Sequence, residues 1–233
     1  MKIVILAGGY GTRLAEYTDK IPKPMVQVGD KPILSHIMNF YQSFGYDDFI
    51  IAAGYKKNII IDYYKNSKEF KNLEIVDTGE NTMTGGRILR LKSHFAKNEN
   101  FFMTYGDGLC SVDLSKLFQF HSLHNKIATV TAVHPPVRFG ELEIDGDEVV
   151  KFDEKHQASA GWINGGYFVL NSNVFNYIDN DSTLFEKEPM TKLFKDKNLQ
   201  AYKHEGFWKC MDTLRDKIDL EKILNDKGPI WKK

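Results

Sequence analysis

Residues 2–14 read KIVILAGGYGTRL, a short β-branched run that leads directly into a glycine-rich loop. The run from Lys2 to Leu6 predicts a buried strand, because strands covered on both faces are apolar along their length. A loop at a strand's carboxyl end is where open α/β sheets bind ligands. Glycines let backbone amides approach phosphate oxygens, and the guanidinium of Arg13 offers two parallel hydrogen bonds to phosphate. The stretch therefore indicates an α/β fold with a cradle for a triphosphate.

Two other glycine-rich motifs are excluded by their spacing. A P-loop requires Gly-Lys followed by Ser or Thr, and no such triplet follows this loop. A dinucleotide-binding fingerprint requires a small residue at the position of Leu14. Taken alone, the loop leaves open a tight turn that needs glycine for its dihedral angles.

Short apolar runs alternate with amphipathic stretches through the first half of the chain, which predicts βαβ units and a mostly parallel central sheet. A small antiparallel extension covering part of the sheet is expected from about Glu141. Thr183 with Glu186, and Thr213 with Asp216, predict capped helix starts. Strands are expected over residues 2–6, 48–53, 74–76, 101–104, 128–133, 149–152 and 167–170, and helices over 32–44, 58–64, 86–93, 114–124, 184–195 and 214–224.

Composition narrows the functional classes. The chain has 233 residues with no visible linker or repeat, so we predict one domain over residues 1–233. Lys plus Arg and Asp plus Glu are both 31, which leaves no broad basic field for nucleic acid. Cys110 and Cys210 have no metal-like spacing, and no apolar run is long enough for a membrane span. We expect a cytoplasmic protein without nucleic-acid or membrane partners.

A second motif adds a family resemblance. Lys23 stands between Pro22 and Pro24, which restrict its backbone, so taken alone it is either an exposed lysine in a Pro-rich turn or a rigidly presented point charge for phosphate. Residues 6–25 resemble the signature of nucleoside-diphosphate-sugar pyrophosphorylases, with Leu-Ala-Gly-Gly, Gly-Thr-Arg-Leu and Pro-Lys-Pro. The resemblance implies a single-domain, Rossmann-like, three-layer nucleotidyltransferase fold of the glycosyltransferase-A kind. It assigns nucleotide binding to Leu6, Ala7, Gly8, Gly9, Gly11, Thr12, Arg13, Lys23, Thr82, Gly85, Gly86, Arg87 and Gly106.

Two aspartates are candidate metal ligands. Asp107 ends an apolar run and lies between glycines, so its carboxylate can reach a cleft at the sheet edge, although Gly-Asp-Gly is also good turn chemistry. In the resembling family the aspartate after this strand binds metal, and Asp212 matches the second metal position. Mg²⁺ binds proteins through one or two carboxylates and takes its other ligands from phosphates and water. We therefore expect Mg²⁺ as the cofactor.

Further segments resemble one branch of the family, the glucose-1-phosphate cytidylyltransferases. They are residues 77–79, 82–87, 138–140, 163–166 and 206–216. The resemblance implies CTP and a small phosphorylated acceptor as partners, with CMP transferred to a sugar 1-phosphate and pyrophosphate released, for surface polysaccharide biosynthesis. Lys155 would meet the acceptor phosphate and act in catalysis with Arg13, Lys23 and Asp107, while Glu154, Lys155, Asn164 and Gly165 would line the acceptor pocket. Residues 1–140 would mainly bind nucleotide and 141–233 mainly acceptor.

Three departures from that branch leave questions open. The chain is shorter between Tyr64 and Glu74, where the branch carries a segment associated with oligomer packing, so homo-oligomerisation is open. Trp162 replaces a smaller apolar residue, and His156 stands where most of the family has proline. A non-sugar acceptor such as phosphoglutamine, and UTP or dTTP in place of CTP, remain alternatives. A nucleotide-sugar glycosyltransferase is the rival class, but the Gly-Thr-Arg and Pro-Lys-Pro motifs favour a triphosphate with a departing pyrophosphate.

Overall fold

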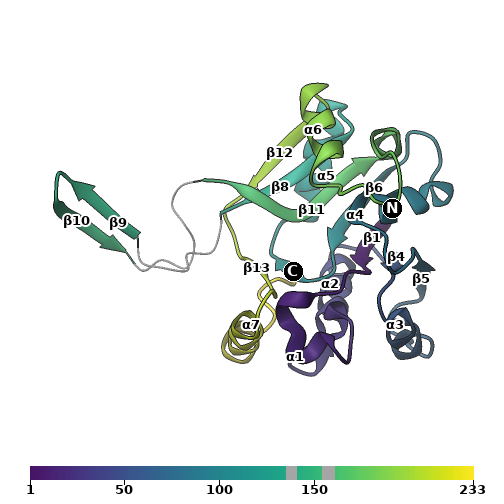
Figure 1. The fold of residues 1–233 in the computed structure, drawn as a ribbon, viewed down its shortest axis with the longest axis horizontal. Coiled ribbons are helices and arrows are strands. Elements are labelled where there is room, and N and C mark those ends of the chain that lie inside the picture. The colour runs from purple at the N-terminus through teal and green to yellow at the C-terminus, as the bar shows by residue number, and fades with distance from the viewer. Residues whose placement is uncertain (135–140, 154–160) are drawn as a thin grey trace.

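A seven-stranded sheet forms the centre of the computed structural model, which describes residues 1–134, 141–153 and 161–233 (Figure 1). The strand order is β12-β8-β11-β6-β1-β4-β5. β11 is antiparallel to β6 and β8, and the other neighbouring pairs of this sheet are parallel, which confirms the predicted mostly parallel sheet. The strands are β1 (Lys2–Ala7), β4 (Asp48–Ala53), β5 (Asn72–Asp77), β6 (Asn100–Tyr105), β8 (Ala128–Val133), β11 (Ile163–Asn171) and β12 (Leu199–His204).

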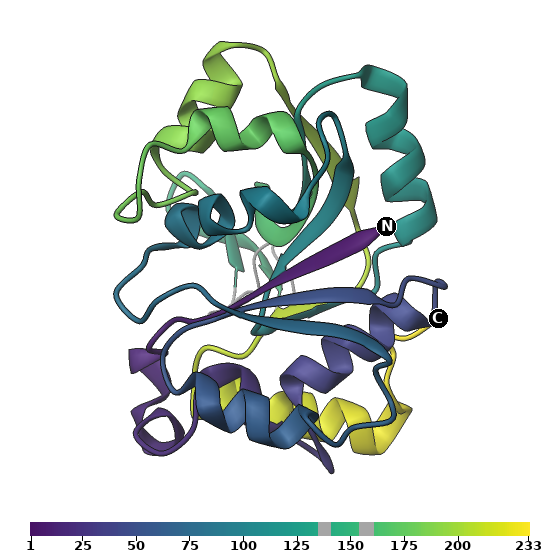
Figure 2. The ribbon, with the colours of Figure 1, turned by 90° about the vertical axis from the view of Figure 1, so that its right-hand side faces the viewer.

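Helices cover both faces of the sheet, as the turned view in Figure 2 shows, so the fold has three layers. Alternate residues of β1 point to opposite faces: Ile3 and Ile5 belong to one buried cluster, Val4 and Leu6 to the other. The first cluster includes side chains of α2 (Ile33–Gln42), α3 (Lys57–Tyr64), α5 (Leu114–His124) and α7 (Leu214–Lys227). The second includes side chains of α4 (Thr84–Arg90) and α6 (Glu188–Lys195).

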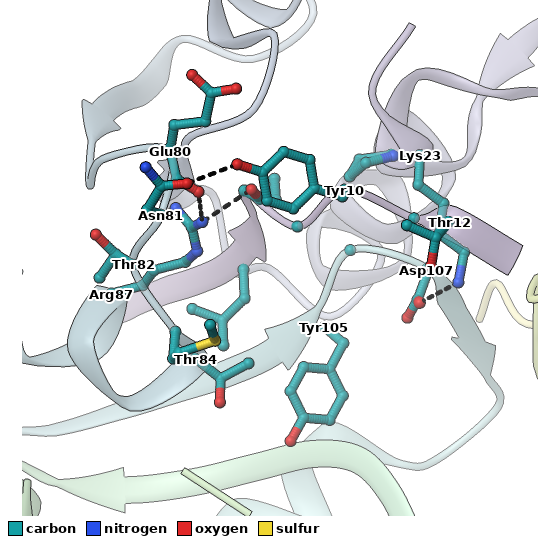
Figure 3. Close-up of a pocket in the computed structure, with 18 of the residues that line it drawn as sticks. Tyr10, Thr12, Lys23, Glu80, Asn81, Thr82, Thr84, Arg87, Tyr105 and Asp107 are labelled. Carbon is teal, nitrogen blue, oxygen red and sulfur yellow. Dashed lines mark hydrogen bonds and ion pairs between the residues drawn. The ribbon is translucent and has the colours of Figure 1, made fainter. Parts of the chain in front are cut away.

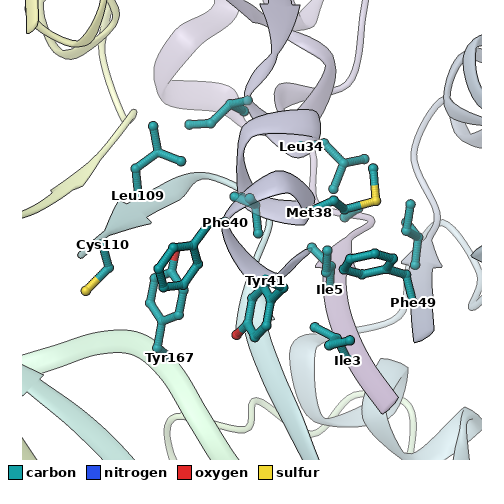
Figure 4. Close-up of a cluster of buried hydrophobic side chains, with 14 of the residues drawn as sticks. Ile3, Ile5, Leu34, Met38, Phe40, Tyr41, Phe49, Leu109, Cys110 and Tyr167 are labelled. Carbon is teal, nitrogen blue, oxygen red and sulfur yellow. The ribbon is translucent and has the colours of Figure 1, made fainter. Parts of the chain in front are cut away.

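The larger cluster is built on aromatic side chains of α2. Figure 4 shows Phe40 and Tyr41 over the sheet beside Tyr167 of β11, with Met38 towards Phe49 of β4. The rings of Phe40 and Tyr167 meet edge to face with centroids 5.9 Å apart. Such large, fully buried side chains supply most of the apolar area that holds the helix on the sheet.

Two of the predicted caps have opposite outcomes. Thr213 and Asp216 form the predicted reciprocal capping box at the start of α7. The helix predicted from residue 184 instead begins at Glu188, so that boundary was wrong. Thr183 Oγ1 accepts the backbone N–H of Asn180, and Glu186 accepts the hydroxyl protons of Thr84 and Tyr105. Thr183 is thus bonded within the turn that precedes it and Glu186 to two distant segments, which leaves no cap at Thr183.

The shorter elements complete the chain and include strands that sequence patterning missed. β7 (Gly108–Cys110) pairs with β13 (Trp208–Cys210), and β2 (Gln27–Val28) pairs with β3 (Lys31–Pro32). β9 (Glu141–Asp145) and β10 (Glu148–Asp153) form the predicted antiparallel extension, but this hairpin stands apart from the sheet instead of covering it (Figure 1). The remaining short helices are η1 (Thr12–Leu14), α1 (Ala15–Thr18), η2 (Lys23–Met25), η3 (Lys92–His94) and η4 (Ser172–Tyr177).

Candidate functional site

A cavity of about 500 Å³ opens at the carboxyl ends of β1 and β6, a volume suited to a small-molecule ligand. Figure 3 shows its wall, which combines the glycine loop, the segment before and within α4, and the end of β6. Most of the predicted nucleotide-binding residues line it. They are Leu6, Ala7, Gly8, Gly9, Gly11, Thr12, Arg13, Lys23, Thr82, Arg87 and Gly106.

Two positions of the loop require glycine for different reasons. Gly11 has a positive φ of 65°, a backbone conformation that side chains disfavour. At Gly8 a Cβ atom would lie 2.1 Å from the Nη1 atom of Arg87, so a side chain is excluded by contact. By contrast, a Cβ at Gly9 would meet nothing within 4 Å, which leaves the backbone there open to the cavity.

Arg87 ties together the loops that follow β1 and β5. Its guanidinium is buried and donates to the carbonyl oxygens of Gly8 at 2.8 Å, Gly79 at 2.7 Å and Glu80 at 3.1 Å, and to Thr78 Oγ1 at 2.9 Å. The predicted nucleotide contact of Arg87 stays a prediction. These hydrogen bonds fix the distance between the two loops that line the cavity.

Gly85 and Gly86 lie behind the cavity wall. A Cβ at Gly85 would be 2.7 Å from the carbonyl oxygen of Thr183, and one at Gly86 would be 2.4 Å from that of Asp181. These glycines let α4 pack tightly against the segment over residues 181–183. They do not line the cavity themselves, and their predicted role in nucleotide binding stays a prediction.

Lys23, Asp107 and Asp212 converge at one end of the cavity. Pairing of β7 with β13, together with a bond from Met211 N to Asp107 O at 2.8 Å, brings the two aspartates together across more than a hundred residues of sequence. Lys23 Nζ lies 2.7 Å from Asp107 Oδ2 and 2.7 Å from Asp212 Oδ1. Nη1 of Arg13 lies 2.9 Å from Asp212 Oδ2. Two of the four predicted catalytic residues, Arg13 and Lys23, are thus adjacent to the predicted metal pair, and a third, Asp107, belongs to it.

The charges at this centre stabilise one another. Burial lowers the pKa of Lys23, but the adjoining carboxylates of Asp107 and Asp212 outweigh it, and the net pKa is raised. Burial raises the pKa of Asp212, but its hydrogen bond and charge interaction with Lys23 outweigh this, and the net pKa is lowered. The Lys23 side chain is only 10% exposed, whereas that of Arg13 is 70% exposed. Lys23 is therefore a resident cation, and Arg13 is positioned to reach a ligand.

The same centre meets the chemical requirement for a divalent ion. Two ionised carboxylates already hold one positive charge between them, and oxygen ligands of this kind suit a hard cation. Among the residues that the structure describes, no group of three or more His, Cys, Asp or Glu side chains is close enough to hold a metal. A metal here would therefore take its remaining ligands from substrate and water.

Of the four predicted acceptor-binding residues, the structure describes two. Asn164 and Gly165 lie on β11, where Asn164 Oδ1 accepts the N–H of Gly166 at 2.8 Å and Gly165 O accepts the indole N–H of Trp208 at 2.7 Å. Glu154 and Lys155 lie outside the described residues. Their predicted roles stay predictions.

Several further residues that line the cavity were not predicted from the sequence, among them Tyr10, Asn81 and Tyr105. Tyr10 closes across it, with its hydroxyl donating to Asn81 Oδ1 at 2.7 Å, and Tyr105 lines it while bonded to Glu186 (Figure 3). Tyr10 lies inside the glycine motif and Tyr105 directly precedes Gly106. Their closeness to these motifs is the one sequence feature that indicates a place in the nucleotide site. Asn81 carries no signal of its own.

A glycine loop at the carboxyl edge of a parallel sheet, beside two carboxylates and a lysine, is the arrangement expected of an enzyme that transfers part of a nucleoside triphosphate. Comparison with known proteins agrees with this class. Residues 2–226 match the family described as Nucleotidyl transferase, and the chain belongs to that family. The family generally uses a divalent metal, a nucleoside triphosphate and a sugar phosphate.

Similar proteins indicate the branch of the family that this chain resembles. The chain is 44% identical to glucose-1-phosphate cytidylyltransferase of Salmonella typhi over 254 aligned positions, covering 100% of this chain and 99% of that protein. It is 39% identical to a probable glucose-1-phosphate cytidylyltransferase of Bacillus subtilis, with the same coverage. The predicted resemblance is thereby confirmed. The aligned length of 254 exceeds the 233 residues of this chain, in keeping with a shortened segment.

Solved structures confirm the fold. HddC from Yersinia pseudotuberculosis, complexed with GMP-PN, superposes with a TM-score of 0.73 at 27% identity over 95% of this chain and 98% of its own. A UDP-glucose pyrophosphorylase superposes with a TM-score of 0.74 at 19% identity, over 97% and 98% of the two chains. Among the described residues, no helix is both long and apolar enough to cross a membrane.

Proposed function

We propose that this enzyme is a Mg²⁺-dependent cytidylyltransferase that transfers CMP from CTP to glucose 1-phosphate, forming CDP-glucose and pyrophosphate. One observation carries the proposal. The 44% identity to a glucose-1-phosphate cytidylyltransferase extends over the whole chain and so includes both the nucleotide cavity and the strands beside it. The geometry supports the same reaction, because Arg13, Lys23 and Asp107 line the cavity and are suited to contact the phosphates of a nucleotide bound there.

The glycine loop and the α4 segment hold the nucleotide. Residues 8–12 line the cavity, and Arg13 extends from the end of this loop into solvent. Thr82, Met83 and Thr84 form the opposite wall, held in place through α4 and Arg87. The nucleotide lies between these two walls, with its phosphates at the glycine loop and its base and ribose at residues 82–84.

The chemistry needs charge neutralisation more than proton transfer. A phosphate monoester has a second pKa of about 6, so the acceptor is already a nucleophile at neutral pH and no general base is required. Lys23 leaves its carboxylate partners for the phosphates, and Arg13 turns from Asp212 towards the departing pyrophosphate. Lys155 aligns the incoming phosphate for in-line attack. Such positioning and electrostatic effects dominate phosphoryl and nucleotidyl transfer.

Asp107 and Asp212 are the residues that would hold Mg²⁺. When bound there, the ion supplies a Lewis acid that withdraws charge from the phosphate oxygens. The protein contributes the position of the two carboxylates, which is fixed by the β7–β13 pairing and by the capping box that begins at Thr213.

A nucleotide screen tests the proposal. Initial rates of pyrophosphate release are measured with glucose 1-phosphate, Mg²⁺ and each of CTP, UTP, GTP, ATP and dTTP. We expect CTP to give the highest kcat/KM. A higher value for UTP or dTTP would place the enzyme in a neighbouring branch of the family, and no release with any of the five would contradict the proposed reaction.

A further inference from the structure

The strand order separates the two substrates along one edge of the sheet. Residues that line the nucleotide cavity follow β1, β5 and β6. The sheet continues beyond β6 through β11, β8 and β12 (Figure 1). The carboxyl ends of β8 and β12 and the amino end of β11 lie at the same edge as the cavity, because β8 and β12 run parallel to β6 and β11 runs against it. An acceptor that approaches Asp107 from the side opposite the nucleotide therefore lies over these three strands.

Four side chains meet at that part of the edge. Trp162 directly precedes β11, and His134 directly follows β8; their rings pack against each other at a tilt of 33°, with centroids 4.0 Å apart. His134 Nε2 lies 3.0 Å from Glu205 Oε2, and Lys203 Nζ lies 5.4 Å from the indole centroid of Trp162. We call these four residues the edge cluster. None of them takes part in the nucleotide cavity.

The edge cluster faces the acceptor position predicted at Asn164. Asn164 and Lys203 both pair with Ala132 of β8, so their side chains share one face of the sheet. Trp162 is two residues from Asn164 and shares that face as well. Tyr167 of β11 pairs with Thr104 of β6, so Trp162 lies beyond the end of β6, up to roughly 13 Å along β11 from the level of Tyr105 at about 3.3 Å per residue. A sugar 1-phosphate that extends from Asp107 along β11 therefore approaches the indole with its sugar end.

The side chains of the cluster are held in place but open to solvent. Trp162 is 37% exposed although one ring packs against it and an ammonium lies over it. His134 is fixed at both ring nitrogens, by Gly161 O at 2.7 Å and by Glu205. The exposed part of an indole held this way offers a rigid apolar surface to the C–H groups of a sugar ring, while Lys203 and Glu205 can bond to hydroxyl groups.

We propose that the edge cluster is the far wall of the acceptor pocket and that Trp162 determines which acceptor is used, by stacking on the ring of a sugar 1-phosphate. The inference rests on the proposed function, because it takes the sugar phosphate as the acceptor. It adds a specificity-determining residue and three supporting side chains that lie beyond the phosphate-binding positions.

Steady-state kinetics of Trp162→Leu test this proposal. We expect KM for glucose 1-phosphate to rise about tenfold, the size of one lost pocket contact, while KM for CTP changes little. Trp162→Phe keeps an aromatic face and is expected to restore most of the acceptor affinity. Phe194→Leu is the matched control, because Phe194 is an exposed aromatic residue, 70% exposed, on α6 towards the amino end of β12.

The outcomes separate the two proposals. An active wild-type enzyme whose acceptor KM is unchanged in Trp162→Leu, or is changed equally by Phe194→Leu, would overturn the edge-cluster proposal and leave the reaction intact. If the wild type turns over only a non-sugar phosphate, the sugar-stacking role is overturned together with the proposed acceptor. Equal rises in KM for CTP and for the acceptor would also count against it, since they indicate a general structural role for Trp162.

Discussion

Replacing Lys23 by methionine tests whether the lysine is the resident cation of the metal pair. Methionine keeps much of the length of the side chain but removes both 2.7 Å bonds and leaves Asp107 and Asp212 with the exposed guanidinium of Arg13 as their remaining counter-charge. Removing one partner of a largely buried charge pair costs about 3 kcal/mol. For a chain of this size that corresponds to a fall in Tm of roughly 6–12 °C. Mg²⁺ should restore part of this loss, because binding to the folded state alone stabilises it.

Thermal unfolding with and without Mg²⁺, in the absence of nucleotide, measures this effect. We expect Mg²⁺ to raise the Tm of Lys23→Met by more than it raises that of the wild type. Lys31→Met is the control, because Lys31 forms an ion pair with Glu69 at the surface, 36% exposed, and is remote from the cavity. In Lys23→Met kcat should also fall about a hundredfold, as for one lost transition-state contact, whereas Lys31→Met should keep the wild-type kcat. An unchanged response to Mg²⁺ together with near-normal kcat would refute the assignment.

Three other predictions follow from the site. Asp107→Asn and Asp212→Asn should each abolish turnover while retaining a cooperative unfolding transition, and near-normal activity of either at saturating Mg²⁺ would contradict the metal assignment. Arg87→Ala should raise KM for CTP and lower stability by about 3 kcal/mol, measured by urea unfolding, because it leaves several buried acceptors without a donor. The folded pKa of Asp212 is lowered, so its contribution to stability is present above its unfolded pKa of about 3.9 and is lost as pH falls through the folded value. Asp212→Asn should therefore show a weaker loss of stability than the wild type on acidification below about pH 4.

Motifs that carry chemistry were predictable from the sequence because each is local. The strand and loop over residues 2–14 and the capping box at Thr213 depend on neighbours within a few positions, and the structure contains both. β4, α5 and β8 were predicted with their boundaries for the same reason, since apolar patterning marks their whole length.

Long-range pairing could not be predicted from the residues alone. The meeting of Asp107 with Asp212 depends on the three-residue strands β7 and β13, which are too short to show a period. The start of α6 was misplaced because Glu186 bonds to Thr84 and Tyr105, which lie far away in sequence. The contacts of Trp162 likewise depend on the order of strands β11, β8 and β12.

The most direct test of the central claim is the identity of the product. Enzyme, CTP, glucose 1-phosphate and Mg²⁺ are incubated together, and the phosphorus species are followed by ³¹P NMR. We predict that the glucose 1-phosphate monoester signal is replaced by the diphosphate signals of CDP-glucose, with one pyrophosphate formed for each CTP consumed. Consumption of CTP without a CDP-linked product, or no reaction at saturating substrates, would contradict the proposed function.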